Sequence, residues 1–429
     1  MSGPKNRSLA LAAYLALSSV AEPALRLWLA RRAWRGKEDP SRLGERFGHA
    51  SHPRPEGRLI WLHGASVGEA VSLLPLIGAL RDASPASLLV TTATLTAAER
   101  LAKVLPEGVL HQFAPIDTRP ALRRFLGHWR PDLAVRVESE IWPRTLIETA
   151  RTGAPMALLN ARLSERSLQG WQRVPGMARA LLAGFAVIET QDRATRTRLQ
   201  SLGLPPERVV QGANLKSAVA VPACAPEALS AAQEAIATRP VWLAASTHDG
   251  EERAVAEAAA LVAETHPDAL LILAPRHPER GAEVAALLAE RGLSTARRSL
   301  GEGPAPDTQV WLADTLGEMG LWYRLAGAAF IGGSLVARGG HTPFEPAALG
   351  VAVVHGPHVE NFVDVYAALA EAKAARAVAT PAALAEAISA LLADTSEARA
   401  MARRGAAVRA RLTPDLAALA ERLLALMDR

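Results

Sequence analysis

The sequence predicts an α/β protein with two Rossmann-like domains that face a cleft, preceded by an apolar N-terminal helix. Its 429 residues, 49% of them hydrophobic, are enough for two domains that each have a core. Short apolar runs alternate with helical stretches of ordinary length, as in βαβ units around a parallel sheet. This alternation stops once, at the Ala- and Pro-rich segment 218–226, and then resumes.

The N-terminal segment is apolar over residues 9–21, is interrupted by Glu22 and Pro23, and continues into a stretch with several arginines. It is shorter than the roughly 20 apolar residues that span a bilayer. Lys5 and Arg7 are not followed by a clear small-residue cleavage site. We therefore expect residues 1–38 to form a signal-anchor or interfacial helix whose arginines contact an anionic membrane surface. A helix packed in the core or interface of a soluble protein is the alternative.

Apolar runs predict strands in both halves of the chain. In the first half they cover residues 59–62, 87–92, 133–137, 156–160 and 185–188, and in the second 240–245, 269–274, 309–313, 328–331 and 351–354. Leucine and isoleucine at three- and four-residue spacing predict a helix over 70–80. The two halves meet near residue 217, which gives domains 39–216 and 217–429. Ligands in this architecture bind in a crevice at the carboxyl ends of the strands.

Composition narrows the possible functions. The formal net charge of +5 suits a nucleic acid, an anionic membrane or a phosphorylated substrate. The single cysteine, Cys224, cannot form an intrachain disulfide and has no neighbours at metal-ligand spacing. No Walker A loop is present, and Gly332-Gly333 is too weak a motif to indicate dinucleotide binding. ATPase and dehydrogenase functions are therefore poorly supported.

The run 59–70 carries the clearest chemical signal, because an apolar strand ends in a glycine-bounded turn that places Glu69 at the start of a helix. Ser66 and Glu69 have the S-x-x-E spacing of a capping box, in which both side chains satisfy backbone N–H groups. Spacing alone favours this structural role. A carboxylate that acts as a base is the alternative, and it requires partners elsewhere in the chain.

Five further sets of loops carry polar groups, and all but the one at the domain junction follow predicted strands. An acidic loop holds Glu138 and Glu140, and the lysine at the domain junction is Lys216. Solvated surface is the plain alternative for the acidic loop, for Lys216 and for residues 160–166. The remaining loops offer arginines, hydroxyls, histidines and glycines that suit anions or sugar hydroxyls, and they cover residues 160–166, 244–252 with 273–280, and 313–320 with 331–346.

Ten blocks in one order resemble the 3-deoxy-D-manno-octulosonic acid (Kdo) transferases of Gram-negative lipopolysaccharide synthesis, which have the two-domain glycosyltransferase-B fold. The resemblance covers nearly the whole chain. The blocks are His63-Gly-Ala-Ser-Val-Gly-Glu69, Glu138-Ser-Glu-Ile-Trp-Pro143, Asn160 to Ser167, Asn214-Leu-Lys216, Ala245-Ser-Thr-His248, Ala274-Pro-Arg-His-Pro278, Gly317-Glu-Met319, Gly332-Gly-Ser334, Gly340 to Pro346 and His355-Gly-Pro-His358.

The resemblance implies inverting transfer of Kdo from CMP-Kdo to the lipid A precursor (lipid IVA) at the cytoplasmic side of the inner membrane. It implies no metal, no further cofactor and no nucleic-acid partner. In the family, the glutamate matching Glu69 is the proton acceptor, which reverses the preference for a purely structural cap. The positions matching Glu138, Glu140 and Lys216 stabilise the transition state.

The resemblance also assigns residues to substrate binding. The positions that match the family's CMP contacts are Pro275, Arg276, Gly317, Glu318, Met319, Thr342, Pro343, Phe344 and Glu345. Further candidates for donor or acceptor contacts are Ser66, Gly68, Arg162, Arg166, Ser246 and His248.

The chain departs from the family pattern at three places. Thr342 replaces the usual asparagine of the CMP-contacting block, and Arg144 replaces an asparagine after Trp-Pro. The segment 91–98 ends in Ala97-Ala98, where the family usually has glycine. Donor handling is therefore expected to differ in detail. Two alternative functions remain open, a glycosyltransferase-B enzyme that uses another nucleotide sugar and a non-catalytic membrane-associated binding protein.

Overall fold

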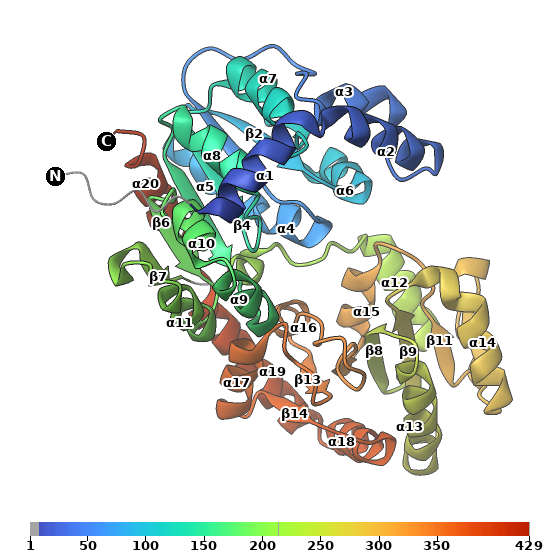
Figure 1. The fold of residues 1–429 in the computed structure, drawn as a ribbon. Coiled ribbons are helices and arrows are strands. Elements are labelled where there is room, and N and C mark those ends of the chain that lie inside the picture. Colours follow the sequence, from blue (N-terminus) through green and yellow to red (C-terminus); the bar gives the residue numbers. More distant parts are fainter. Residues whose placement is uncertain (1–7, 213, 429) are drawn as a thin grey trace. The chain divides into compact units, whose positions relative to one another are not determined.

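The computed structural model describes residues 8–212 and 214–428, and the chain divides into two compact units. Unit 1 holds the residues up to Val219 together with those from Thr413 onward, and unit 2 is Ala220–Leu412. In the described residues each unit contains one parallel sheet of seven strands with helices packed on it (Figure 1).

Unit 1 has the strand order β3-β2-β1-β4-β5-β6-β7. The first strand therefore lies beside β2 on one side and β4 on the other, and the chain changes direction of winding between β1 and β4. The strands are β1 (Leu59–His63), β2 (Ser87–Thr92), β3 (Leu110–Phe113), β4 (Leu133–Val137), β5 (Met156–Ala161), β6 (Val187–Thr190) and β7 (Val209–Gln211).

The helices of unit 1 connect these strands and also include two N-terminal helices and one C-terminal helix. They are α1 (Leu9–Val20), α2 (Glu22–Trp34), α3 (Leu43–Arg46), α4 (Val67–Ser72), α5 (Leu74–Ala83), α6 (Leu95–Val104), α7 (Arg119–Trp129), α8 (Pro143–Arg151), α9 (Glu165–Gln172), α10 (Pro175–Leu182), α11 (Arg193–Ser201) and α20 (Leu416–Leu424), with 3₁₀ turns η1 (Pro40–Arg42), η2 (Pro206–Arg208) and η3 (Leu215–Ala218).

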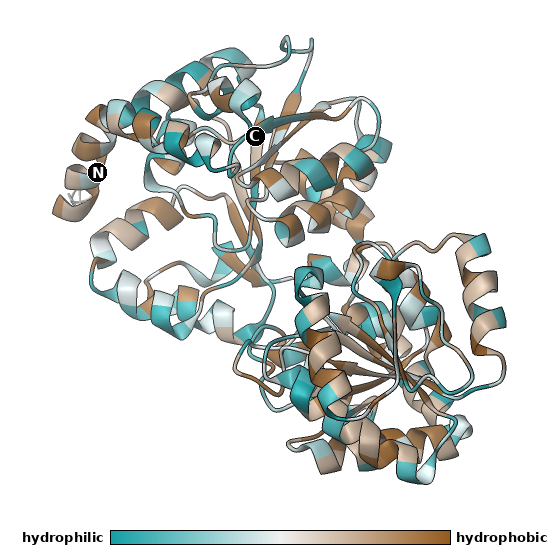
Figure 2. Cartoon of the chain, turned by 90° about the vertical axis from the view of Figure 1, so that its right-hand side faces the viewer, coloured by the Kyte–Doolittle hydropathy of each residue, from teal (hydrophilic) through white to brown (hydrophobic). Residues whose placement is uncertain are grey.

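Strand residues of unit 1 alternate between two cores, as the period of a β-strand requires. Leu59 and Trp61 of β1 point into a core that includes residues of α7, α8 and α10. Ile60 and Leu62 point into the opposite core, which includes residues of α5, α6 and α20. Both faces of the sheet are covered, which is why its strands read as continuous apolar runs, and the strands are coloured brown for hydrophobic residues in Figure 2.

Unit 2 repeats this plan with the strand order β10-β11-β9-β8-β12-β13-β14, so that its winding changes direction between β8 and β12. Its strands are β8 (Val241–Thr247), β9 (Leu270–Pro275), β10 (Thr295–Arg297), β11 (Val310–Leu312), β12 (Ala328–Ile331), β13 (Ala352–His355) and β14 (Ala375–Ala377). Its helices are α12 (Pro226–Ile236), α13 (Glu251–Thr265), α14 (Gly281–Glu290), α15 (Met319–Leu325), α16 (Phe344–Ala348), α17 (Val363–Glu371), α18 (Pro381–Ala393) and α19 (Thr395–Leu412), with 3₁₀ turns η4 (Pro278–Arg280) and η5 (Arg298–Leu300).

The N-terminal segment forms two helices that meet at Ala21, and Pro23 occupies the first turn of α2, where its missing N–H costs nothing. Helix α1 lies across α7 and α8 (Figure 1). Over residues 8–212 and 214–428, the structure contains no helix with the length and apolar character needed to traverse a membrane.

Arg144 holds α1 in place. Its guanidinium is buried, donates to Ser18 Oγ at 3.0 Å, Ser19 Oγ at 2.8 Å and the carbonyl of Leu15, and forms an ion pair with Glu148 at 2.9 Å. This departure from the family pattern therefore serves the packing of α1 on α8.

Two predictions of local structure need correction. The helix expected over 70–80 is two helices, α4 and α5, because Pro75 cannot donate a backbone hydrogen bond to continue α4. Residues 413–429 were assigned to the second domain, but the chain from Thr413 onward belongs to unit 1. The physical reason is the burial of Leu419 and Leu423 of α20 in the core beside α5.

Candidate functional site

Glu69 lies at the direction change of the first sheet, in the first turn of α4, the helix that follows β1. Ser66 is the N-cap of α4, and its hydroxyl accepts from the N–H of Glu69 at 3.4 Å. The Glu69 carboxylate accepts from the Ser66 hydroxyl at 2.9 Å and from the N–H of Ala65 at 2.8 Å. A Cβ at Gly64 would lie 2.9 Å from the N atom of Ala70, so only glycine allows this close approach. The capping geometry is present, and it fixes the orientation of the carboxylate.

Glu138 follows β4, the strand on the other side of the direction change. It has a left-handed backbone (φ 59°) and its Oε1 lies 2.5 Å from Lys216 Nζ. Lys216 lies in η3, which the Asn160 side chain helps to position by accepting from the N–H of Leu215 at 3.3 Å. The ion pair holds the Lys216 ammonium group against the Glu138 carboxylate, and η3 contacts α4, the helix that carries Glu69.

Glu140 is held by aromatic and cationic neighbours. Its Oε2 accepts from Trp142 Nε1 at 2.5 Å and from His63 Nε2 at 3.2 Å. Buried Arg136, from the middle of β4, donates to the backbone carbonyl of Glu140 at 3.3 Å. With His63 Nε2 as donor, its Nδ1 accepts from the Thr91 hydroxyl at 2.9 Å.

The surroundings of Glu69 and Glu140 shift the pKa values of their carboxyl groups in opposite directions. Burial and then the charges of Glu140 and Glu138 raise the pKa of Glu69 above its usual value. Burial would also raise the pKa of Glu140, but hydrogen bonds from His63 and Trp142 and the charge of Arg136 outweigh it and lower this pKa. A raised carboxyl pKa beside a second carboxylate that stays ionised is an arrangement found at sites of acid–base chemistry.

A second polar cluster lies at the direction change of the sheet in unit 2. His248, after β8, and His341, after β12, approach with Nε2 atoms 2.9 Å apart and nearly parallel rings. Burial, and then the charges of His248, Arg276 and His277, lower the pKa of His341 to about 4. One ring therefore donates to the other while both are neutral.

The glycine-rich loop after β12 is anchored by Glu251, which is fully buried. Its carboxylate accepts from the N–H groups of Gly333 at 2.6 Å, Ser334 at 2.9 Å and Leu335 at 2.8 Å, and from the N–H of His248 at 3.0 Å. Four backbone donors on one carboxylate fix both loops of this cluster. Sequence analysis did not single out Glu251 as a site residue.

The residues expected to contact CMP lie in unit 2, at the carboxyl end of β9 and in the loops and first helical turns that follow β9, β11 and β12. Arg276 is exposed, and Pro275 and Phe344 are buried. Glu318 forms an ion pair with Arg298 at 2.7 Å, and Gly317 before it has a positive φ of 87°. The Thr342 hydroxyl accepts from the N–H of Phe344 at 3.3 Å.

Glu345 lies in the first turn of α16, and burial raises the pKa of its carboxyl group. Pro343 is the N-cap of that helix, and Met319 begins α15. Ser246 has a left-handed backbone (φ 55°) at an irregularity where β8 pairs with β9.

The remaining predicted contact residues differ in their surroundings. Arg162 is half-buried, and its carbonyl accepts from the Ser139 hydroxyl in the acidic loop at 2.7 Å. Arg166 is exposed on α9, and Gly68 is exposed in the first turn of α4. No metal site is indicated in the described ranges, which contain no group of three or more His, Cys, Asp or Glu side chains suited to a metal ion.

Sequence reasoning did not assign roles to His63, Arg136 or Trp142 around Glu140. A charged Arg136 inside the apolar run 133–137 was the available signal, because an arginine in a buried strand requires a partner.

Comparisons with known proteins agree with this geometry. A family model described as 3-deoxy-D-manno-octulosonic-acid transferase (kdotransferase) matches residues 41–219. A protein of Arabidopsis thaliana named as a probable mitochondrial 3-deoxy-D-manno-octulosonic acid transferase is 37% identical over 391 residues, which cover 89% of this chain and 88% of the relative. The 3-deoxy-D-manno-octulosonic acid transferase of Haemophilus influenzae is 33% identical over 396 residues, with 90% and 91% covered.

Among solved structures, a glycosyltransferase from Rickettsia africae matches with a TM-score of 0.59 at 13% identity, and the match covers 86% of this chain and 99% of that one. At 13% identity the similarity shows that the two chains share a fold and nothing more. The predicted α/β fold with two Rossmann-like domains of the glycosyltransferase-B type is confirmed.

Proposed function

This chain belongs to the 3-deoxy-D-manno-octulosonic acid transferase family, and we propose that it transfers Kdo from CMP-Kdo to a hydroxyl group of the lipid A precursor, with inversion at the anomeric carbon. The observation that supports this most directly is the oriented carboxylate of Glu69, whose pKa is raised beside the ionised Glu140. Family membership supports the donor, and the acceptor follows from the class of enzyme.

Glu69 is proposed as the general base. Its carboxylate takes the proton of the attacking sugar hydroxyl as the bond between Kdo and CMP breaks through an oxocarbenium-like state. The ionised Glu140 stabilises the positive charge that develops on the sugar ring. The hydrogen bonds from Ala65 and Ser66 hold the base in place, so it needs no rotamer search before each turnover.

Departure of CMP requires cationic groups. Lys216 is proposed to supply one positive charge, and its ion pair with Glu138 fixes the position of its ammonium group. Arg276, with the residues around Gly317 and Glu345, is proposed to bind CMP, since arginine suits phosphate and a carboxylate suits ribose hydroxyls. These groups are proposed to support transfer with no metal and no further cofactor.

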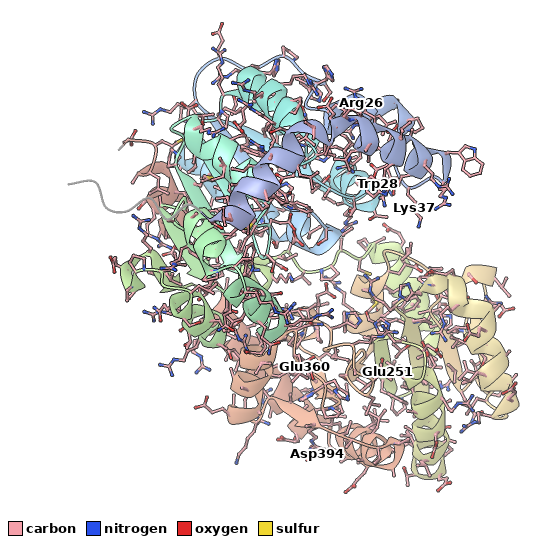
Figure 3. The ribbon with its side chains drawn as sticks, viewed as in Figure 1. Arg26, Trp28, Lys37, Glu251, Glu360 and Asp394 are labelled. Carbon is pink, nitrogen blue, oxygen red and sulfur yellow. The ribbon has the colours of Figure 1, made fainter. Side chains whose placement is uncertain are left out.

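The N-terminal helices are proposed to lie at the anionic cytoplasmic face of the inner membrane. Half of the exposed large hydrophobic side chains in the described residues lie on or just beside α1 and α2, and they are Leu9, Leu17, Val20, Leu27, Trp28 and Trp34. Basic residues accompany them, including Arg26 on α2 and Lys37 beyond its end, which are labelled with Trp28 in Figure 3. Exposed apolar and basic side chains on the same pair of helices are typical of a segment that lies at a membrane interface.

The experiment that tests this function measures transfer from CMP-Kdo, generated in situ, to the tetraacylated lipid A precursor, with the product identified by mass. Wild type is compared with Glu69→Gln, since the glutamine oxygen can still accept from the N–H of Ala65 and its amide group can donate to Ser66 Oγ. We expect product with wild type and a loss of about 10²–10⁴-fold in kcat for the variant. No product from folded wild type would refute the proposal and direct attention to other nucleotide sugars, and full activity of the variant would exclude Glu69 as the base.

A further inference from the structure

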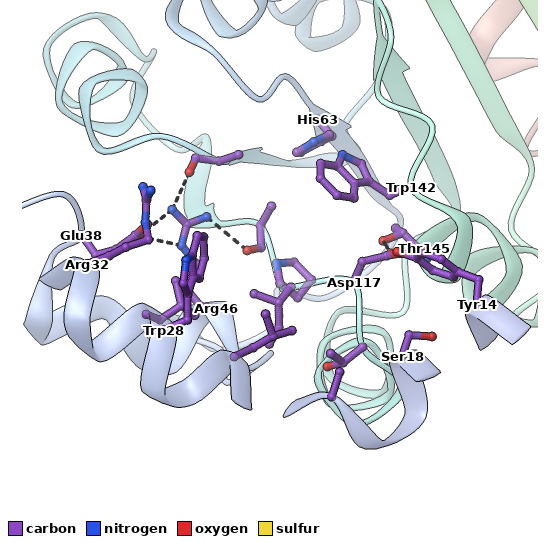
Figure 4. Close-up of a pocket in the computed structure, with 18 of the residues that line it drawn as sticks. Tyr14, Ser18, Trp28, Arg32, Glu38, Arg46, His63, Asp117, Trp142 and Thr145 are labelled. Atoms are coloured by element: carbon purple, nitrogen blue, oxygen red, sulfur yellow. Dashed lines mark hydrogen bonds and ion pairs between the residues drawn. The ribbon is translucent and has the colours of Figure 1, made fainter. Parts of the chain in front are cut away.

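A pocket of about 460 Å³ lies in unit 1, and two of its lining residues, His63 and Trp142, are hydrogen-bonded to Glu140. One wall consists of apolar side chains of α1, α2 and the residue between them, namely Leu17, Ala21, Leu25, Trp28 and Leu29. His63, Trp61 and Trp142 line it as well, and Figure 4 shows His63 and Trp142 opposite the N-terminal helices. The pocket belongs wholly to unit 1.

The charged groups Arg46 and Asp117, which line the pocket, form hydrogen bonds within the protein. Arg46 is buried and donates to Glu38 at 2.8 Å and to the carbonyl of Ala93 at 2.5 Å. Asp117 accepts from the Tyr14 hydroxyl at 2.6 Å and from the N–H groups of Arg144 and Thr145 at 2.9 and 2.7 Å. Because these polar groups already have partners, the space between them favours an apolar occupant.

The two ends of the pocket differ. Leu17 and Trp28 line it and are also 67% and 52% exposed, so the wall continues into the apolar surface of α1 and α2. At the other end, His63 and Trp142 both donate to the carboxylate of Glu140. An acyl chain whose free end lies between α1 and α2 therefore has its attached end beside His63 and Trp142, next to Glu140.

We propose that this pocket binds one acyl chain of the acceptor lipid and thereby brings the sugar hydroxyl of its headgroup to Glu69. The volume lies at the lower end of the range for small-molecule pockets, which suits a single chain. Arg32 and Arg46 line the same pocket and share the single carboxylate of Glu38, so these three side chains carry one net positive charge, which suits an anionic acceptor. The pocket's contact with His63 and Trp142 favours the acceptor over a bulk phospholipid, whose headgroup has no role beside Glu140. The inference rests on the proposed function, since it assumes a lipid acceptor.

The test fills the pocket and leaves the catalytic groups intact. Ala21→Trp places an indole at a pocket-lining position, and Ala24→Trp makes the same change three residues along, at an exposed position outside the lining. Both variants and wild type are assayed with the tetraacylated lipid A precursor and with the same headgroup after hydrolysis of its chains. Transfer to the chain-free acceptor reports on folding and catalysis for each variant.

We expect Ala21→Trp to lower the ratio of kcat/KM for the acylated over the chain-free acceptor by about tenfold or more. We expect Ala24→Trp to keep the wild-type ratio. An unchanged ratio in Ala21→Trp overturns the acyl-chain assignment and leaves the proposed function standing. Absence of transfer by wild type to either acceptor overturns the proposed function instead.

A second measurement decides the matter if Ala21→Trp does not fold. Wild-type protein is irradiated with an acceptor that carries a diazirine on one acyl chain, and the labelled peptides are mapped. Labelling of residues around Leu25 and Leu29 supports the assignment. Labelling confined to Leu27 and Trp34, which are exposed and outside the lining, overturns it. Equal labelling of the pocket by a diazirine phosphatidylethanolamine in the presence of acceptor also overturns it, because the occupant is then bulk lipid.

Discussion

At the scale of single residues, Glu69 combines a structural and a chemical role. The hydrogen bonds that cap α4 also favour the ionised carboxylate, whereas burial and the neighbouring Glu140 and Glu138 oppose ionisation, and the opposing effects prevail. A base must be deprotonated, so activity is lost as the pH falls through its pKa. We therefore expect the acidic limb of the kcat/KM profile to lie above the value of about 4.3 that is usual for glutamate.

Glu140→Gln tests the cause of this shift. Glu140 has a lowered pKa, so its charge is present where Glu69 titrates, and its removal lowers the pKa of Glu69. The acidic limb should move to lower pH, whatever the loss in maximal rate. Glu165→Gln, at an exposed carboxylate on α9 in the same unit, is the control and should leave the limb in place. A limb that stays fixed in Glu140→Gln would show that this charge does not set the pKa.

Part of the candidate site could be predicted from the sequence, because its carboxylate residues lie after the ends of predicted strands. Glu138 and Glu140 come directly after one predicted strand, Glu69 begins the helix after another, and the strand order brings those two strands side by side. Sequence spacing did not predict that His63 and Trp142 donate to the same Glu140 oxygen, since that depends on side-chain rotamers across three segments. Arg144 was expected to affect donor handling, whereas its guanidinium is used in the packing of α1.

At the scale of elements, α1 depends on one buried guanidinium. Arg144 and Arg151 each place Nη1 2.9 Å from the same Glu148 oxygen, but the Arg144 side chain is 4% exposed and that of Arg151 is 58% exposed. Arg144→Ala should lower the free energy of unfolding by about 3 kcal/mol, because Ser18, the Leu15 carbonyl and Glu148 lose a buried donor. Arg151→Ala should cost at most about 1 kcal/mol.

Hydrogen exchange distinguishes a local from a global effect of these substitutions. Amides of α1 should lose protection in Arg144→Ala while those of β1 and β4 keep theirs, because α1 contributes its contacts from outside the sheet. Equal losses for Arg144→Ala and Arg151→Ala would contradict the role of burial.

The loop after β12 depends on Glu251 in a similar way, in unit 2. This residue lies at the start of α13 in Figure 3, and its carboxylate serves four backbone donors with two oxygens. Glutamine has one acceptor oxygen, so Glu251→Gln leaves donors of Gly333, Ser334 or Leu335 unpaired at about 1–3 kcal/mol each. We expect lower stability of unit 2 and weaker binding of CMP by calorimetry. Asp249→Asn, at a side chain that is 84% exposed, is the control, and the same loss of CMP affinity there would contradict the prediction.

The strands that sequence analysis missed share one position in the fold. They are β3, β7, β10 and β14, and each lies at an edge of its sheet. Interior strands such as β4 and β12 are covered on both faces and form apolar runs, whereas an edge strand such as β3 (Leu110–Phe113) includes His111 and Gln112. Hydrophobic periodicity therefore predicts the interior strands of a parallel sheet but not its edge strands, which are short and partly polar.

At the scale of the whole molecule, the chain leaves unit 1 near Val219 and returns to it at Thr413. A division at a single point, as the sequence suggested, could not show this return, because α20 has the same amphipathic pattern whichever core it joins. In the structure Leu419, Ala420 and Leu423 are buried in the core of unit 1, and Arg422 forms an ion pair with Glu189 at 2.7 Å. The last helix of the chain thus completes the fold of its first domain.

This discontinuity predicts that damage at the C-terminus destabilises the N-terminal domain. Leu423→Ala removes a side chain that is 1% exposed and should lower the free energy of unfolding of unit 1 by about 2–5 kcal/mol. Amide exchange should accelerate in β1, β2 and β4 and stay unchanged in β8, β9 and β12, although residue 423 is far closer in sequence to the latter strands. Glu421→Ala, at an exposed position of the same helix, should leave both sets unchanged. If the loss of protection fell on β8, β9 and β12 instead, α20 would belong to unit 2 in solution, and the folding of unit 1 would not depend on the return of the chain.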